Sequence, residues 1–581
     1  MVQPDLSTIR SHLSALYGRS AGDEAFDRLR AILGRYHHLP VSPAEGTDRS
    51  LSERDMLLIT YADQLHEADT FPFETLANFC EQYLSGLVNS LHLLPFFPYS
   101  SDDGFSVIDY KAVNPAFGSW DDVARLGRSF RLMFDAVINH VSVQHEWFQA
   151  FLQDDPHYRD YFIVVEDNPD LSQVVRPRAL PLLTPFDTPS GVKKVWTTFS
   201  TDQVDLNFQN PDVLLEIIDT LLFYVDRGAQ LIRLDAIAYL WKEIGTSCIH
   251  LPQTHRIIRL FRAVLDIVAP DVLLITETNV PHKDNISYFG NGSDEAQMVY
   301  NFALPPLLLH TFYTGDSRRL SSWAAGLQLP SSRTIFFNFL ASHDGIGVNP
   351  ARGILSDAEI DAMIRRTIQH GGLVSYKHDP DGAQIPYELN INYFDALSNP
   401  VGKESLNIQI DRFMSAQAIM LALVGVPGIY FHSLFGSRSW RAGVDLSGRN
   451  RAINRQKFEL AAFESELADE ISLRQQVFQR YAQLMRARSS SAAFHPHGRQ
   501  QVLACGEAIF ALLRVSPDES RQVLCLHNIS DQAQNAMINL KDMAGLPSQL
   551  INLITNDRMA HPLNGNLILG PYETLWLTIK E

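Results

Sequence analysis

Short apolar runs alternate with amphipathic stretches over most of this chain. Several runs are separated by stretches with the 3.6-residue period of a helix, such as Val213–Asp226 and His255–Val268. The eight runs that read as buried strands are Met56–Thr60, Ser90–Leu94, Leu132–Ile138, Leu231–Asp235, Leu273–Glu277, Met298–Phe302, Thr334–Ser342 and Pro427–Phe431. Alternating strands and helices indicate an α/β fold with a parallel sheet, and eight repeats favour a closed (β/α)8 TIM barrel. An open doubly wound sheet is the competing fold, but no GxGxxG motif follows any of the runs.

The rest of the chain divides around this predicted barrel. The expected units are an N-terminal helical extension (1–54), the barrel (55–141 and 200–348), an inserted subdomain (142–199), a loop-rich insertion (349–397), the end of the barrel (398–490) and a C-terminal β-sandwich (491–581). The loop-rich insertion is expected to hold a helix at Asp357–His370 and a polar loop at Lys377–Tyr387. The four C-terminal strands are expected at Val502–Ala504, Ala508–Arg514, Gln522–His527 and Leu567–Ile579. Insertions of this length in a compact domain are usually functional.

Charge and composition exclude several classes of protein. Lys and Arg total 48 against 66 Asp and Glu, a net charge of −18, and no basic stripe interrupts it, so nucleic acid is not an expected partner. No apolar stretch is long enough to span a membrane, and the N-terminus lacks a signal-peptide core. The four cysteines lack metal-ligand spacing and indicate free thiols in a reducing compartment. We therefore expect a cytoplasmic monomer or homodimer that acts on small molecules.

Two carboxyls stand at the ends of consecutive predicted strands. Asp235 ends the run that begins at Leu231, and Glu277 ends the run that begins at Leu273. The C-terminal edge of a barrel carries the active site, so both side chains are expected in one cavity. Cleaving a glycosidic bond with retention needs two carboxyls about 5–5.5 Å apart, a nucleophile and a proton donor. One such acid is more often a helix N-cap or a surface residue, but two in succession favour catalysis.

Arg233 stands two residues before Asp235, so strand alternation puts both side chains on one face. A cation there would keep a nucleophilic carboxylate ionised, while Glu277 must hold its proton until delivery. An ordinary buried ion pair is the alternative explanation of Arg233, and it is compatible with that role.

Four segments resemble the hallmark regions of the alpha-amylase family of glycoside hydrolases. They are Asp135-Ala-Val-Ile-Asn139-His140, Ile232-Arg233-Leu-Asp235-Ala, Ile275-Thr-Glu277 and Leu340-Ala-Ser-His343-Asp344, in the family's order. The resemblance implies that Asp235 is the nucleophile, Glu277 the general acid/base and Asp344 the carboxylate that stabilises the transition state. It also implies that His140, His343 and Arg233 hold the glucosyl hydroxyls and the nucleophile.

Within that family the chain is similar to the sucrose phosphorylase subgroup. The segments that carry this likeness are Leu58-Ile-Thr-Tyr61-Ala-Asp63, Leu93-Leu-Pro-Phe96, Asp102-Asp-Gly104-Phe105, Arg176-Pro-Arg178, Asn301-Phe-Ala-Leu-Pro-Pro306, His343-Asp344-Gly-Ile-Gly347 and Arg451-Ala-Ile-Asn454-Arg455. The likeness implies that Asp102 and Arg451 clamp the glucose ring, that Tyr239 contacts substrate, and that the Arg178 segment and the loop ending at Tyr387 serve the acceptor and phosphate in turn. Arg178 is the first expected phosphate ligand and Arg176 the second. The subgroup implies no metal and no cofactor, with inorganic phosphate as co-substrate.

One position departs from the sucrose phosphorylase pattern. Those enzymes have Gln beside the loop tyrosine, whereas this chain has Glu388 after Tyr387. Glu388, the segment with His282 and Lys283, and the N-terminal extension resemble glucosylglycerate phosphorylases, the branch that phosphorolyses 2-O-α-glucosyl-D-glycerate. His282 and Lys283 either help to bind an anionic acceptor or lie in a solvated loop. Sucrose phosphorylase, glucosylglycerol phosphorylase, an α-glucoside hydrolase and a catalytically inactive sugar-binding barrel are the alternatives.

Overall fold

The computed structural model describes residues 6–39, 51–177, 181–378, 383–538, 549–560 and 566–580. Eight parallel strands close into a barrel in the order β1-β16-β12-β11-β10-β9-β4-β3. Their bounds are β1 Leu57–Thr60, β3 Ser90–Leu93, β4 Arg131–Ala136, β9 Ala229–Leu234, β10 Leu273–Thr276, β11 Met298–Tyr300, β12 Ile335–Asn338 and β16 Val426–Tyr430. Each predicted run overlaps one of these strands, so the predicted (β/α)8 barrel is confirmed.

Several predicted runs extend past the carboxyl end of the strand. The run Thr334–Ser342 contains β12, which ends at Asn338, although Phe339 and Leu340 beyond it are buried. Burial continues into the loops at this edge because they are covered by neighbouring chain, so hydrophobicity alone does not mark where the ladder ends.

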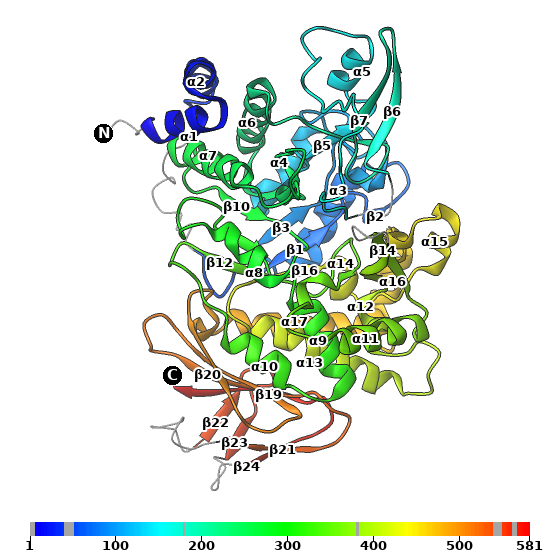
Figure 1. Cartoon of the computed structure of the whole chain (residues 1–581). Helices are drawn as coiled ribbons and strands as arrows, with labels where there is room; N and C mark the ends of the chain where they lie inside the picture. The colour runs from blue at the N-terminus through cyan, green and yellow to red at the C-terminus, as the bar shows by residue number, and fades with distance from the viewer. Residues whose placement is uncertain are drawn as a thin grey trace.

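Helices cover the outside of the barrel (Figure 1). The main ones are α3 Pro72–Phe79, α4 Trp120–Ser129, α6 Pro211–Asp226, α7 Pro252–Val268, α9 Leu304–Thr314, α10 Arg318–Ala325, α13 Leu406–Ala422 and α17 Leu473–Ser489. The two predicted helices are α6 and α7, and each begins earlier than its apolar pattern because a proline occupies the first turn, where its missing N–H costs nothing. The Asn210 side chain accepts from the N–H of Asp212 and caps α6.

The N-terminal segment folds as a helical hairpin, α1 (Ser7–Tyr17) and α2 (Arg19–Arg35), with α1 against α7 and α2 against α6 (Figure 1). Ile9, Leu13 and Leu29 are buried at this junction. Asp219 of α6 receives polar contacts from the hairpin, including a 2.6 Å bond from Arg35 Nη2. The helical hairpin is thus attached to the two helices that lead into strands β9 and β10.

Short elements fill the two long insertions. The first holds α5 (Glu146–Leu152) and the hairpin of β6 (Leu183–Thr188) with β7 (Gly191–Trp196), and β5 (His140–Ser142) pairs with β8 (Gln203–Asp205) at its base. The second holds α11, α12 and two further strands. Their bounds are α11 Asp357–Gln369, α12 Tyr393–Leu397, β14 Leu373–His378 and β15 Gln384–Asn390.

Most of the predicted polar loop at Lys377–Tyr387 belongs to the antiparallel hairpin of β14 and β15, so that prediction is wrong at both ends. The hairpin continues onto β13 (Ile346–Gly347), which begins two residues after Asp344. The two strands of this hairpin do not show a clear apolar–polar alternation, and the sequence pattern therefore does not reveal it.

The C-terminal part forms a six-stranded sheet in the order β18-β19-β20-β25-β22-β23 and a two-stranded sheet of β21 and β24, at the end of the molecule away from α5 (Figure 1). The strands are β18 Arg499–Leu503, β19 Ile509–Val515, β20 Gln522–Asn528, β21 Gln534–Met537, β22 Gln549–Asn552, β23 Arg558–Ala560, β24 Asn566–Leu569 and β25 Thr574–Lys580. The predicted strand Leu567–Ile579 is therefore two strands that lie in different sheets.

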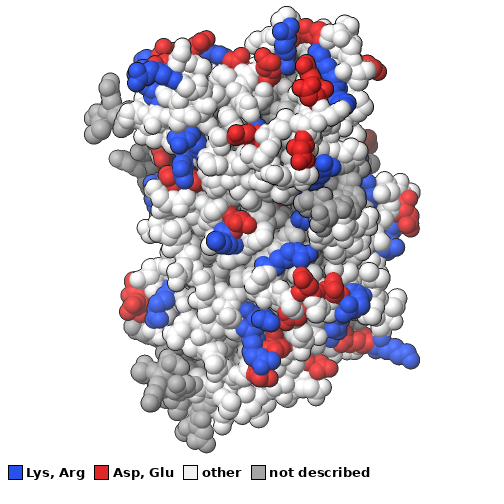
Figure 2. Space-filling model, in the orientation of Figure 1, with Lys and Arg blue, Asp and Glu red and all other residues white. Residues whose placement is uncertain are grey.

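Acidic and basic side chains are interspersed on the face shown in Figure 2, without a continuous basic band. Across the described ranges, no helix has the length and apolar character needed to cross a membrane.

Candidate active site

A narrow cavity lies at the carboxyl edge of the barrel strands. Its lining residues are Asp102, Phe105, His140, Phe199, Gln203, Asp235, Ala236, Ala238, Tyr239, Glu277, Thr278, Asn279, Val280, His343, Asp344, Tyr387 and Arg451. Nine predicted site residues are therefore brought together from loops far apart in the sequence. The free volume is about 60 Å³, whereas ligand sites usually offer some 300 Å³ or more. Side chains or loops at the mouth must move to admit a ligand of ordinary size.

Asp235 and Glu277 follow directly on two strands that pair in register. Arg233 is opposite Ile275 and Leu234 opposite Thr276, so the next residues of β9 and β10 leave the barrel side by side. The N–H of Glu277 donates to the carbonyl of Leu234 at 3.1 Å. The parallel ladder thus places both carboxyls at one edge, as the sequence predicts.

The residue after Asp235 shapes the space between the two acids. Ala236 has φ +48° and ψ 32°, a left-handed conformation that is unusual for alanine and that occurs at functional sites. This turn directs its N–H at Glu277 Oε2, which accepts at 3.1 Å. The Glu277 carboxyl therefore leans towards the turn that follows Asp235.

Arg233 lies behind the two acids, with only 2 % of its side chain exposed. Its guanidinium donates to Asp135 and to Asp235 Oδ1, the latter at 2.8 Å, and Nη2 lies 3.9 Å from Glu277 Oε1. Asp135 also contacts His92 Nε2 at 2.7 Å. A buried cation thus joins two carboxylates, and Arg233 orients Asp235 from outside the cavity lining.

The charges of this group decide how the acids are protonated. Burial raises the pKa of Asp235 well above its ordinary value, which Arg233 opposes and Glu277 reinforces. Burial also raises the pKa of Glu277, again against Arg233. Two charges in one buried site are disfavoured, so the state in which one of the two acids is protonated is favoured over the state in which both are ionised. Because Arg233 contacts Asp235 directly, we assign the charge to Asp235 and the proton to Glu277.

A second charged group faces the acids. Arg451 Nη1 contacts Asp344 Oδ1, and its Nη2 lies 3.0 Å from Glu388 Oε2. Arg455 Nη1 lies 3.1 Å from Asp102 Oδ1, and its Nη2 lies 3.6 Å from Asp344 Oδ1. Two arginines therefore hold Asp344 and Asp102 in place.

The two histidines of the cavity are neutral. His343 stacks on Phe105 with ring centroids 4.6 Å apart, and burial together with Arg455 lowers its pKa far below the usual range. Burial likewise lowers the pKa of His140. A neutral imidazole can donate one hydrogen bond and accept another, which suits contact with sugar hydroxyls.

Several predicted site residues lie elsewhere. Glu388 is 1 % exposed and contacts Arg451. It does not line the cavity, as a substrate-binding residue would, but holds Arg451, which does. His282 packs between Trp323 and Phe336, with ring centroids 6.0 and 6.4 Å away.

Lys283 is exposed and Arg176 half-buried. None of Lys283, Arg176 and His282 is among the described residues that line the cavity. Arg178 lies outside the described residues.

Four residues of this region were not selected from the sequence: Gln203, Asn279, Arg455 and Lys242. Arg455 stands in the same motif as Arg451, so its spacing could have indicated it. The other three carry no local signal, since their surroundings come from distant parts of the chain. Among the described residues, no three His, Cys, Asp or Glu side chains gather closely enough to hold a metal ion.

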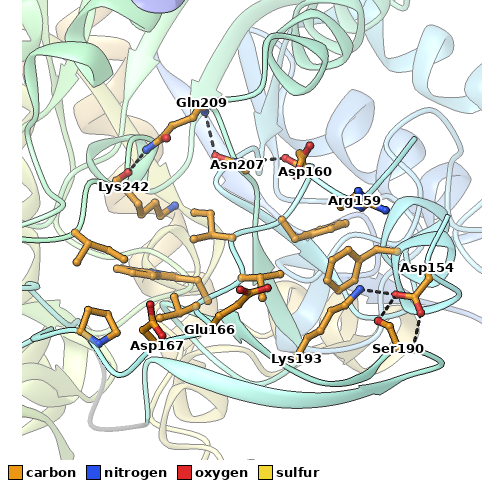
Figure 3. Close-up of a pocket in the computed structure, with 18 of the residues that line it drawn as sticks. Asp154, Arg159, Asp160, Glu166, Asp167, Ser190, Lys193, Asn207, Gln209 and Lys242 are labelled. Carbon is orange, nitrogen blue, oxygen red and sulfur yellow. Dashed lines mark hydrogen bonds and ion pairs between the residues drawn. The ribbon is translucent and has the colours of Figure 1, made fainter. Parts of the chain in front are cut away.

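A larger cavity of about 990 Å³ lies in the first insertion, between α5, the β6–β7 hairpin and the loop around Lys242 (Figure 3). Size alone favours it as a ligand site. Its carboxylates, however, do not converge on one point; Asp154, for example, is held by Lys193 and Ser190. The narrow cavity, with its acids on adjacent strands, is the better catalytic site.

Known proteins share this architecture. The model of the alpha-amylase catalytic domain matches residues 81–321. A glucosylglycerate phosphorylase of Allomeiothermus silvanus is 51% identical over 99% of both chains. The chain belongs to the alpha-amylase family.

More distant members share less of the chain. A sucrose phosphorylase of Agrobacterium vitis is 30% identical over 75% of this chain and 88% of that protein. The crystal structure of a sucrose 6F-phosphate phosphorylase from Thermoanaerobacter thermosaccharolyticum, 25% identical, superposes with a TM-score of 0.72 over 83% of this chain and 96% of that one. The protein is thus an enzyme of the alpha-amylase family, and its phosphorylase relatives include one that matches its whole length.

Proposed function

We propose that this enzyme is a retaining phosphorylase that transfers the glucosyl group of 2-O-α-glucosyl-D-glycerate to inorganic phosphate. The products are D-glycerate and α-D-glucose 1-phosphate. One observation carries the choice of donor: identity to a glucosylglycerate phosphorylase is 51% over 99% of the chain, against 30% over 75% for a sucrose phosphorylase. The acids of the cavity support the type of reaction, and the match over 99% of the chain supports the choice of substrate.

The first half-reaction transfers glucose to the enzyme. Asp235 attacks the anomeric carbon as a carboxylate, and Glu277 gives its proton to the glycosidic oxygen as glycerate leaves. Arg233 holds the attacking carboxylate at 2.8 Å. His343 and Asp344, together with Arg451, contact ring hydroxyls, and these contacts strengthen as the ring flattens toward the oxocarbenium-like transition state.

In the second half-reaction phosphate attacks the glucosyl-enzyme, a step that water performs in a hydrolase. A phosphate oxygen bonds to the anomeric carbon, the bond to Asp235 breaks, and Glu277, now a carboxylate, takes the phosphate proton. Two inversions give net retention. Arg178 is our first choice as phosphate ligand and Arg176 our second, because a guanidinium fork bonds two phosphate oxygens at once.

No resident metal or cofactor takes part in these steps, and we place the enzyme in the cytoplasm. Its four cysteines are buried and none of them forms a disulfide, as expected of a protein that does not depend on disulfides.

The substrate assignment is tested by offering glucosylglycerate, sucrose and glucosylglycerol separately, with and without phosphate, and measuring glucose 1-phosphate and glucose. We expect phosphate-dependent glucose 1-phosphate from glucosylglycerate, with kcat/KM well above that of the other two donors. A preference for sucrose or glucosylglycerol would refute glucosylglycerate as the donor but not the proposed phosphorolysis. Glucose release independent of phosphate would indicate a hydrolase, and no turnover of any donor would indicate a binding protein.

A further inference from the structure

Lys242 is a buried lysine that lines the larger cavity and pairs with residues behind the catalytic cavity. Its side chain is 2 % exposed, with Nζ 2.7 Å from Asp205 Oδ2 and 2.7 Å from Asn139 Oδ1. The residue lines the larger cavity, where its carbonyl accepts from Gln209 Nε2 at 2.6 Å (Figure 3). Asn139 directly precedes His140, which lines the catalytic cavity. The ammonium group of Lys242 therefore lies immediately behind the catalytic wall.

The charges of Lys242 and Asp205 fix the orientation of the Asn139 amide. An ammonium group only donates and a carboxylate only accepts, so Oδ1 of Asn139 must face Lys242 and Nδ2 must face Asp205. The second of these contacts is 3.1 Å long. A flipped amide would place its N–H groups against the ammonium and its oxygen against the carboxylate. Both contacts would be repulsive in a buried site.

The fixed amide in turn meets the ring of His140. Asn139 Nδ2 lies 3.3 Å from His140 Nδ1, and His140 Nε2 lies 2.9 Å from the carbonyl oxygen of Phe105. A neutral imidazole carries one proton. With that proton on Nε2, Nδ1 accepts from Asn139 and Nε2 donates to Phe105. With the proton on Nδ1, two N–H groups would face each other.

Gln203 favours the opposite arrangement. Its Nε2 lies 3.1 Å from His140 Nε2, where it could donate to an unprotonated ring nitrogen. The same Gln203 nitrogen already donates to the Phe105 carbonyl at 2.9 Å. Gln203 therefore has another acceptor, whereas Asn139 cannot turn away from its two charged neighbours. The ion pair decides between the two tautomers.

We propose that Lys242 is a positioning residue for glucosyl binding: acting through Asn139, it holds His140 in the tautomer with the proton on Nε2. That tautomer presents an N–H, and not a lone pair, at the cavity wall that also carries Phe105 and Gln203. The N–H donates to the Phe105 carbonyl, which holds the His140 ring in one orientation at the wall where the glucosyl group is proposed to bind. This role rests on the proposed glucosyl transfer, but the tautomer itself is a property of the enzyme without substrate.

The test reads the tautomer by ¹⁵N NMR of enzyme labelled at histidine, at a pH near neutral. The His140 signals are identified by their loss in His140→Gln. We expect the shift of a protonated nitrogen at Nε2 and of an unprotonated one at Nδ1. A proton on Nδ1 in the wild-type enzyme would overturn the proposal without any variant and without any assay of activity.

Variants then test whether Lys242 is the cause. Lys242→Met alone leaves a buried carboxylate without its cation and endangers folding, so the double variant Lys242→Met/Asp205→Asn, which removes both charges, is the main one. We expect a mixture of tautomers and a fall of about 10- to 100-fold in kcat/KM for the glucosyl donor, the size usual when a supporting hydrogen bond is lost.

Lys193→Met is the matched control, because Lys193 also lines the larger cavity but pairs with Asp154 at 2.5 Å, away from His140. It should change neither the tautomer nor kcat/KM. A double variant that keeps the wild-type tautomer would show that Lys242 acts on stability alone and would refute the proposal. Inactivity of every form of the enzyme, with the expected tautomer present, would count against the proposed reaction and not against this role.

Discussion

Arg233 offers a direct test of how Asp235, the proposed nucleophile, is kept ionised. In Arg233→Lys the planar fork, which serves Asp135 and Asp235 together, is replaced by one ammonium group on a shorter stem. Asp135 is the more deeply buried of the two acids and also contacts His92, so we expect the lysine to pair with Asp135. Asp235 then loses its cation contact.

The size of the effect follows from that single lost contact. A hydrogen bond to a charged group contributes about 1.5–3 kcal/mol, and one pKa unit corresponds to about 1.4 kcal/mol. The pKa of Asp235, already raised by burial, should therefore rise by about one to two further units. A carboxyl with a higher pKa needs a higher pH to ionise, so the acid limb of kcat/KM should move to higher pH. At pH values below both acid limbs, kcat/KM should fall about 10- to 100-fold.

The measurement is kcat/KM for the glucosyl donor as a function of pH in both enzymes, over the range in which circular dichroism shows both folded. Arg318→Lys, at an exposed pair with Asp316, is the control and should leave the profile unchanged. An acid limb at the wild-type position, with activity lowered equally at all pH values, would show that Arg233 acts on geometry and not on ionisation.

Four further predictions concern other parts of the molecule. Asp235→Ala should abolish turnover and leave the circular dichroism spectrum unchanged; activity comparable to that of the wild-type enzyme would disprove the role of Asp235 as nucleophile. Arg178→Ala should raise KM for phosphate more than it slows transfer to a sugar acceptor, and equal losses would exclude its proposed role. Burial would raise the pKa of Asp219, but two cations outweigh it and hold that pKa below its ordinary value. Asp219→Asn should therefore lower the free energy of unfolding by about 2 kcal/mol, seen as a lower Tm, at pH values where the wild-type carboxyl is ionised. The difference should shrink in stronger acid, as the wild-type carboxyl protonates. Gly104→Ala should lower both Tm and kcat/KM, because φ is +109° there and a Cβ would come within 2.4 Å of the Pro95 carbonyl oxygen; wild-type values of both would contradict this.

The barrel and its two acids could be predicted from the sequence because their signals are local. Each strand is a short apolar run, and the side chain that follows it is placed by the strand itself. Asp235 and Glu277 reach one cavity since parallel strands end at one edge, whatever the loops do. The family motifs predicted further residues around these acids from their positions in the sequence.

The contacts that set charge and orientation were decided by tertiary structure. Glu388 meets Arg451 across 63 residues, and Lys242 meets Asn139 across 103. Neither pair has a periodic pattern, because each is made by loops whose paths depend on the folded barrel. His282, equally polar in sequence, faces an aromatic cluster. A residue's type limits the bonds it can make, but only the fold determines which partner is within reach.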